Sequence, residues 1–300
     1  MKIMTRRFRR FIFWIFVVFF VALSIAVSLI AQGWRFDFNT LKVVKTGGIY
    51  IKTSVTEAKV YINDKYYKST GGLLNYTVLL SGLVPKQYSI FIYKDGYFPW
   101  NKTIEVKNGL VTELSHIILL PIKLNKTKIT EIITQQISEF SVKDKMIEIK
   151  NNKTKITKTY NFEGTLVSSE KFKIATSSPL RVTSPDEKKE LFVSENKIWI
   201  SYISDEKEDP ARKIGETDLV SPYEGPIKFF DWFNDSEHVI WYANSELKVA
   251  ERDDRGGKRY AASFYLSIDS PVFWNQQNSE FYFFELEDKV MILYKINVGG

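Results

Sequence analysis

The sequence has no cysteine and only two histidines among its 300 residues. The absence of cysteine excludes a disulfide-stabilised scaffold, a thiolate metal site and a cysteine nucleophile. His116 and His238 each lie in a strand-like segment, and no third ligand accompanies either of them at a recognisable spacing. We therefore predict two structural or surface histidines, no metal site and no cofactor.

The net positive charge is concentrated in the first ten residues. Five of the 42 basic residues lie there, and the formal net charge of the whole chain is +7, so the remainder is close to neutral. Nucleic-acid binding requires a basic surface that follows the phosphates. The charge distribution therefore predicts no nucleic-acid partner.

One long apolar run stands out near the start of the chain, where residues 11–34 carry no charge. About 20 apolar residues cross the roughly 30 Å hydrocarbon layer of a bilayer, whereas the apolar core of a cleaved signal peptide has about 7 to 15. We predict an uncleaved transmembrane signal anchor rather than a cleaved signal. Phe11 and Phe20 belong to its apolar body, and Trp14 and Trp34 lie near its two ends, where indoles prefer the interface.

The charges next to this run predict its orientation. Residues 1–10 form a basic tip that includes Arg6, Arg7, Arg9 and Arg10. Positive charge favours the cytoplasmic side of a membrane. We expect the N-terminus in the cytoplasm and residues 35–300 outside the cell membrane.

After a short connector, apolar residues recur with period two, as in Ile49 and Ile51 or in Ile104 and Val106. Gly, Asn and Asp pairs separate these runs, for example Asn108-Gly109. Five to seven short strands in about 75 residues predict that residues 47–121 form a small β-sandwich.

The same segment resembles a PEGA domain, a small extracytoplasmic β-sandwich of bacterial and archaeal surface proteins. The resemblance is carried by Lys94-Asp95-Gly96-Tyr97, Trp100, the segment 104–109 and Leu119-Leu120-Pro121. The chain departs from the family pattern in its first two turns, where Thr56-Glu57-Ala58 and Asp64-Lys65 stand. The resemblance implies a binding or spacer module without catalytic residues.

Residues 122–300 contain about four similar segments, each with an aromatic or apolar start, a polar turn, a strand, a short turn and a second strand. Phe140, Pro185, Trp232 and Trp274 occupy corresponding positions, with spacings of 45, 47 and 42 residues. A period of 40 to 50 residues made only of strands is typical of propeller blades. We predict a small, open or irregular propeller-like domain.

Residues 184–296 also resemble TolB-like and WD40-like propeller repeats. The resemblance is carried by Ser184-Pro185-Asp186, Leu191-Phe192-Val193 and Ile198-Trp199-Ile200, with 251–257 as the hairpin end of a blade. The predicted fold is therefore an all-β ectodomain, with a small β-sandwich followed by propeller-like antiparallel blades, behind one N-terminal transmembrane helix.

Aromatic residues supply the candidate binding site. Flat rings pack on sugar faces and at protein hot spots, and Tyr66, Tyr67, Tyr97 and Trp100 are denser than a small core requires. Tyr66 and Tyr67 are adjacent in a strand, so one of them must point outward. The alternative interpretation is that Tyr97 and Trp100 only pin a hairpin to the sandwich.

The functional hypothesis is a membrane-anchored binding protein of a prokaryotic cell envelope, not an enzyme, which displays its two modules to an envelope polysaccharide or a surface protein. The alternative is an envelope hydrolase with carboxylates such as Asp231, Asp235 or Glu237 on a propeller face, but fold analogy alone carries little weight. The acidic residues of the propeller-like part otherwise predict a solvated face. A third hypothesis is a sensor or secretion accessory whose outer part reports through the helix. We do not favour it, because the predicted ten-residue cytoplasmic tip has no room for a signalling domain.

Overall fold

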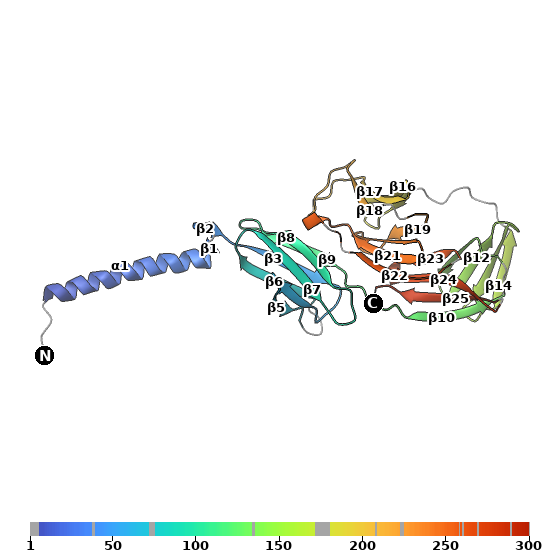
Figure 1. Cartoon of the computed structure of the whole chain (residues 1–300), viewed down its shortest axis with the longest axis horizontal. Helices are drawn as coiled ribbons and strands as arrows, with labels where there is room; N and C mark the ends of the chain where they lie inside the picture. The colour runs from blue at the N-terminus through green and yellow to red at the C-terminus, as the bar shows by residue number, and fades with distance from the viewer. Residues whose placement is uncertain are drawn as a thin grey trace.

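The computed structural model describes residues 6–37, 40–71, 76–133, 136–171, 181–207, 209–222, 225–257, 259, 261–268, 270–288 and 290–299. It begins with helix α1 (Arg6–Ala31), which projects away from the β-rich remainder of the molecule (Figure 1). At 1.5 Å per residue its 26 residues extend about 39 Å, more than the roughly 30 Å of a bilayer core. The helix is therefore long and apolar enough to span a membrane.

The side chains of α1 are exposed, as expected for a helix whose apolar surface faces lipid rather than protein. Phe11, Trp14 and Phe20 are 63%, 62% and 69% exposed. The helix starts at Arg6, so the basic cluster Arg6, Arg7, Arg9 and Arg10 lies within the helix and not in a separate tip.

The helix ends earlier than predicted. Gly33 has a φ of +86°, a left-handed conformation that terminates helices, and Trp34 lies beyond it in strand β1 (Trp34–Asp37). Strand β2 (Lys42–Lys45) pairs antiparallel with β1. Thr46 then closes this hairpin by donating its backbone amide and its hydroxyl to the carbonyl of Gly33. Trp34 is thus part of the hairpin that links α1 to the first β module.

The first module is a two-sheet sandwich whose facing surfaces are filled by alternate residues such as Ile49, Ile51, Ile90 and Ile92. One sheet has the order β6-β3-β9 and the other the order β5-β4-β7-β8, with β3 and β9 parallel. The strands are β3 (Gly47–Thr53), β4 (Lys59–Ile62), β5 (Lys65–Ser69), β6 (Thr77–Leu83), β7 (Gln87–Tyr93), β8 (Trp100–Glu105) and β9 (Val111–Ile117).

Four four-stranded antiparallel sheets follow, and we call them blades one to four. Blade one is β11 (Glu139–Lys143), β12 (Met146–Asn151), β13 (Ile156–Asn161) and β14 (Leu166–Lys171). Blade two is β15 (Arg181–Thr183), β16 (Lys189–Ser194), β17 (Lys197–Tyr202) and β18 (Thr217–Ser221). Blade three is β19 (Ile227–Trp232), β20 (His238–Ala243), β21 (Glu246–Glu251) and β22 (Ala261–Tyr265), with the short 3-10 helix η1 (Arg255–Gly257) before β22. Blade four has β23 (Val272–Asn275), the 3-10 helix η2 (Gln276–Asn278), β24 (Glu280–Glu287) and β25 (Val290–Asn297). The predicted all-β fold with a small β-sandwich, propeller-like antiparallel blades and one N-terminal apolar helix is confirmed.

The fourth strand of blade four comes from elsewhere in the chain. Strand β10 (Lys126–Ile132) pairs antiparallel with β25 and forms the outer edge of that blade. Sequence analysis placed the first repeat at residues 130–170, which includes the end of β10, whereas blade one begins with β11. Local patterns could not identify the partner of β10, because the paired residues lie more than 150 positions apart.

Three hydrophobic clusters join the blades in series. One links blades two and three, one links blades four and one, and the largest links blades three and four to the core of the sandwich. In the described part of the chain none of these clusters joins blade one to blade two, which lie apart in Figure 1. The four blades therefore form an open propeller, with the sandwich packed against blades three and four.

Candidate functional site

The predicted tyrosines lie at the outer edge of the sandwich, on β5. Tyr66 and Tyr67 are 59% and 47% exposed. The pairing of β4 with β5 shifts register between Val60 and Tyr61, so Tyr66 lies opposite Tyr61 while Tyr67 is an extra residue in the edge strand. This bulge explains why two adjacent tyrosines are both exposed, where a regular strand would alternate.

Tyr66 starts a row of aromatic rings across three neighbouring strands, which we call the aromatic row: Tyr66 on β5, Tyr61 on β4, and Phe91 and Tyr93 on β7. Successive ring centroids are 5.7, 5.8 and 6.4 Å apart. The last three of these rings are half-buried. Sequence analysis did not include them, although Phe91 and Tyr93 occupy alternate positions of one strand.

The other two predicted residues belong to the packing of the module. Tyr97 is half-buried against the core, forms a β-bridge with Pro121, and has the Lys94 ammonium 5.3 Å from its ring centre. Trp100 is completely buried, so its assignment as a surface binding residue is wrong. Its indole Nε1 donates a hydrogen bond of 3.0 Å to Glu251 of blade three, because the start of β8 is covered by the propeller.

Trp100 belongs to a buried junction between the two modules. The side chain of Lys102 is only 1% exposed. Its ammonium lies 2.6 Å from a carboxylate oxygen of Glu251 and donates a hydrogen bond of 2.6 Å to the carbonyl of Asp253. Arg255 pairs with the Asp253 carboxylate at 2.7 Å and donates to the carbonyl of Glu113 on β9. Sequence analysis predicted that the acidic residues of this hairpin end are solvated. For residues 251–254 this prediction is wrong in part, because the first carboxylate, that of Glu251, is buried against the sandwich.

Close backbone approach completes this junction. Gly256 has a φ of +75°, and a Cβ atom at this position would lie 2.5 Å from the carbonyl oxygen of Thr103. Only glycine allows η1 to approach β8 this closely.

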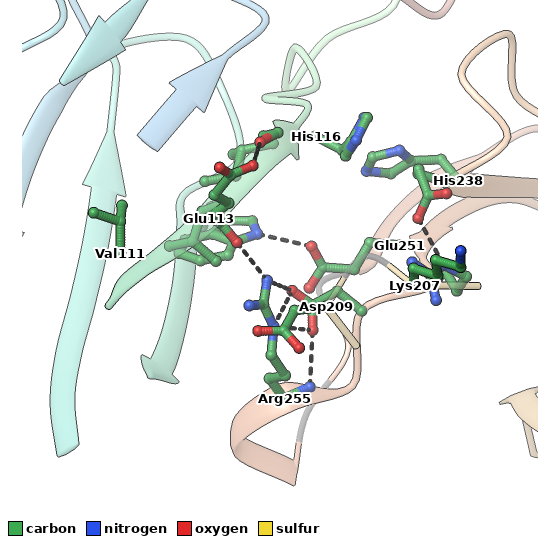
Figure 2. Close-up of a pocket in the computed structure, with 15 residues that line it drawn as sticks. Val111, Glu113, His116, Lys207, Asp209, His238, Glu251 and Arg255 are labelled. Carbon is green, nitrogen blue, oxygen red and sulfur yellow. Dashed lines mark hydrogen bonds and ion pairs between the residues drawn. The ribbon is translucent and has the colours of Figure 1, made fainter. Parts of the chain in front are cut away.

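Beside the junction lies a cleft of about 360 Å³, lined by both modules. From the sandwich, Glu113 and His116 of β9 face it, and from the propeller His238 of β20 and Glu251 of β21. Figure 2 shows the imidazoles of His116 and His238 pointing toward each other across the cleft. The only two histidines of the chain, which sequence analysis assigned no shared role, thus meet at one site.

The His238 ring is held by a neighbouring carboxylate. Its Nδ1 lies 2.7 Å from Asp235, whose other oxygen accepts the backbone amides of Glu237 and His238 at 3.0 Å each. Although burial disfavours the imidazolium, Asp235 and the carboxylates of Glu251 and Glu237 raise the pKa of His238 above 6.5. Burial likewise opposes ionisation of Asp235, yet the two histidines, chiefly His238, lower its pKa to about 2.

The other ring nitrogen of His238 has no such contact. The side chain is 1% exposed, and its Nε2 atom has no hydrogen-bond partner among the residues that the structure describes. A buried polar atom without a partner is costly and uncommon in folded proteins.

A second charged cluster lies in blade two and contacts blade three. Carboxylate oxygens of Asp186, Glu206 and Glu237 lie within 4.8 Å of one another, the spacing of a cation site. The Lys189 ammonium already fills the centre, at 2.8, 3.0 and 3.1 Å from these three residues, with its side chain 0% exposed. The cluster is therefore a complete ion network and holds its own cation.

The carboxylates of the alternative hydrolase interpretation have separate roles in the structure. Asp235 holds His238, and Glu237 pairs with Lys189 and with Arg252 at 2.6 Å. Asp231 accepts the amide of Trp232, and burial raises its pKa to about 6. Asp235 and Glu237 thus already form ion pairs with basic side chains. Neither is available as the second catalytic carboxylate that a hydrolase site at Asp231 would need.

Comparison with known proteins supports the description of the first module. Residues 46–118 match the PEGA domain family, which confirms the resemblance inferred from sequence. No curated protein matches the chain. Among solved structures, Kluyveromyces lactis Hsv2 is similar with 10% identity and a TM-score of 0.26 over 82% of this chain and 74% of that chain. The β-propeller domain of Myceliophteria thermophila Cps50 (Swd1) is similar with 12% identity and a TM-score of 0.26 over 69% and 66% of the two chains. Because these TM-scores are low, the propeller-like architecture is concluded from the four sheets of this chain and not from these similarities.

Proposed function

We propose that this protein is a membrane-anchored binding protein of a prokaryotic cell envelope, in which α1 spans the membrane and residues 35–300 lie outside. The PEGA match supports a surface or binding module, and the basic start of α1 supports a cytoplasmic N-terminus. The β1–β2 hairpin leads from α1 directly into β3, and the propeller follows the sandwich (Figure 1). A membrane-spanning α1 therefore puts the sandwich next to the membrane and the propeller beyond it.

The observation that carries the binding proposal is the aromatic row on the sandwich. Its four rings, with centroids 5.7 to 6.4 Å apart, form a line of partly exposed aromatic surface, and the three tyrosines add hydroxyl groups. Lys59 lies on the same face and pairs in register with Tyr93, which adds a positive charge and hydrogen-bond donors beside the rings. Aromatic rings flanked by donors suit the alternating apolar faces and hydroxyls of a polysaccharide, and the lysine favours an acidic one.

Binding is tested with the full chain in detergent and acidic envelope polysaccharide. We expect Tyr66→Ala to weaken binding about threefold to tenfold, since one stacked ring contributes roughly 0.5–1.5 kcal/mol. Tyr265→Ala is the matched control, because Tyr265 is a 76% exposed tyrosine on β22, outside the aromatic row. Equal loss in both variants, or none in Tyr66→Ala, would contradict the proposal. Capture of an envelope protein instead, through the same row, would replace polysaccharide by protein as the partner.

The orientation can be tested with single cysteines, because the natural sequence has none. Thr5→Cys and Ser263→Cys place one thiol at each end of the proposed topology. In intact cells a membrane-impermeant maleimide should label the cysteine at position 263 and not that at position 5. The reverse pattern would contradict the proposed orientation, and a shortened N-terminus in the mature chain would show that the helix is a cleaved signal.

A further inference from the structure

The cleft between the two modules contains a feature that display alone does not explain. His116 comes from the sandwich and His238 from blade three, and both line the same 360 Å³ space with their rings turned toward each other (Figure 2). His116 is solvent-exposed, whereas His238 is buried.

His238 has the arrangement of a metal-ligating histidine. In such sites one ring nitrogen donates to a carboxylate, which fixes the tautomer and the ring orientation, and the other nitrogen offers its lone pair to the metal. Here Asp235 holds Nδ1 at 2.7 Å, and two backbone amides in turn hold Asp235. The Nε2 atom is almost fully buried and has no partner in the described residues, and His238 is one of the residues that line the cleft.

The charges around this atom favour a cation. Asp235 lies 2.7 Å from the His238 ring, and Glu237 and Glu251, although paired with Arg252 and Lys102, line the same cleft. The Asp235 carboxylate stabilises a positive charge on the imidazole, and a divalent ion at Nε2 would experience the same field. Imidazole nitrogen is a preferred ligand of Zn²⁺, Cu²⁺ and Ni²⁺, whereas Ca²⁺ and Mg²⁺ prefer oxygen.

We propose that the cleft binds a divalent transition-metal ion of the zinc class, ligated by Nε2 of His238 and the imidazole of His116. Water completes the coordination. Because the two ligands belong to different modules, the bound ion fastens the sandwich to blade three and leaves coordination positions open to solvent. A structural zinc site has four protein ligands, so this two-histidine site binds more weakly.

The test is a titration of the metal-free full chain in detergent with Zn²⁺, using calorimetry and a purification tag without histidine. We expect one ion per chain, and at least tenfold weaker binding in His116→Gln and in His238→Gln, because each variant removes one of two ligands. Asp235→Asn should weaken binding about tenfold to a hundredfold, as expected for a residue that positions a ligand. Zn²⁺ should also raise the unfolding temperature of the natural chain but not that of the histidine variants.

Two controls keep the experiment decisive. Because His116 is exposed, His116→Gln leaves the core intact and tests the site even where His238→Gln does not fold. Asp186→Asn changes the Lys189 cluster instead and should bind Zn²⁺ as the natural chain does. The proposal is overturned if the natural chain shows no saturable Zn²⁺ binding, if His116→Gln binds as tightly as the natural chain, or if Asp186→Asn abolishes binding.

Discussion

Blades two and three contain the same turn with different outcomes. In blade two the turn runs from Asp186 to Lys189, and in blade three from Asp235 to His238. In both, an acid pairs with a base three residues later, the second residue has a φ near +58°, and the base is buried. Lys189 is surrounded by three carboxylates, whereas His238 has one partner and an open nitrogen.

The difference follows from the chemistry of the two bases. An ammonium has three donors on one atom, so a single cluster of carboxylates can satisfy all of them. An imidazole has two nitrogens on different sides of a rigid ring, and the carboxylate of its own turn reaches one of them. The second nitrogen must face whatever lies on the other side, which here is the cleft beside the PEGA sandwich. One fold position therefore supplies a closed ion cluster in one blade and a candidate ligand in the next.

The largest expected effect comes from removing the base of the closed cluster. Lys189→Met leaves Asp186, Glu206 and Glu237 together without their cation. Removal of one partner from a buried ion network costs about 3–5 kcal/mol. Denaturant unfolding measures this loss, and Lys188→Met serves as control. Lys188 has a 47% exposed side chain 3.6 Å from Glu206 and should change stability by less than about 1 kcal/mol. Equal stability of the two variants would show that the closed cluster has no special structural role.

A smaller loss is expected at the junction between the modules. Lys102→Met removes the ammonium that lies against Glu251 and Asp253, but Trp100 and Arg255 still donate to these two carboxylates. We expect a loss of about 2 kcal/mol, the cost of an incompletely satisfied buried charge. Thermal unfolding should show it, and exposed Lys52 of β3 provides a neutral control as Lys52→Met. A loss as small as the control's would mean that the sandwich and the propeller are not coupled through this contact.

The open turn predicts a pH dependence near neutral pH that the closed turn lacks, because the closed turn lowers the pKa of its carboxyl groups and raises that of Lys189. Asp235, Glu237 and Glu251 raise the pKa of His238 above 6.5, so the stability from the imidazolium is present below 6.5 and is lost as pH rises through the raised pKa. Asp235 has a pKa of about 2 instead of 3.8, so its contribution is present above 3.8 and is lost as pH falls toward 2.

Unfolding midpoints of the natural chain and of His238→Gln across this range measure the effect. Their difference should be greatest between pH 3.8 and 6.5 and should shrink on either side. His116, Glu113 and Lys207 also face the cleft, so His116→Gln is measured in parallel to separate the two histidines. A difference that is constant with pH would show that no ion pair forms in this turn.

The smallest effect on stability is expected at the aromatic row. Tyr66 is 59% exposed on an edge strand, and Tyr66→Ala should change the free energy of unfolding by less than about 0.5 kcal/mol. This separates binding from folding, because the same variant is expected to weaken polysaccharide binding. A loss of 2 kcal/mol or more would mean that the ring is structural, and its use in the binding test would have to be abandoned.

Local patterns were sufficient for much of the architecture. Apolar residues at alternate positions identified the sandwich strands, and residues 46–118 match the family that they resemble. Residues Phe140, Trp232 and Trp274 are buried in their blades, but Pro185 is exposed in a turn, because the residue that ends the corresponding strand of blade two is Thr183. The aromatic row was found only at its edge. Tyr61 lies five residues from Tyr66, but Phe91 and Tyr93 come from β7 and meet these rings only through strand pairing.

The amino-acid order alone determined the apolar helix, the strand content and the repeat spacing, because hydrophobic periodicity and turn residues act over a few neighbouring positions. Only the tertiary structure decided that β10 completes blade four, that Trp100 is covered by the propeller, and that His116 and His238 share a cleft. These relations join residues about 120 to 170 positions apart, and no local rule encodes them. They arise because each blade and the sandwich must bury the side that a single sheet leaves exposed.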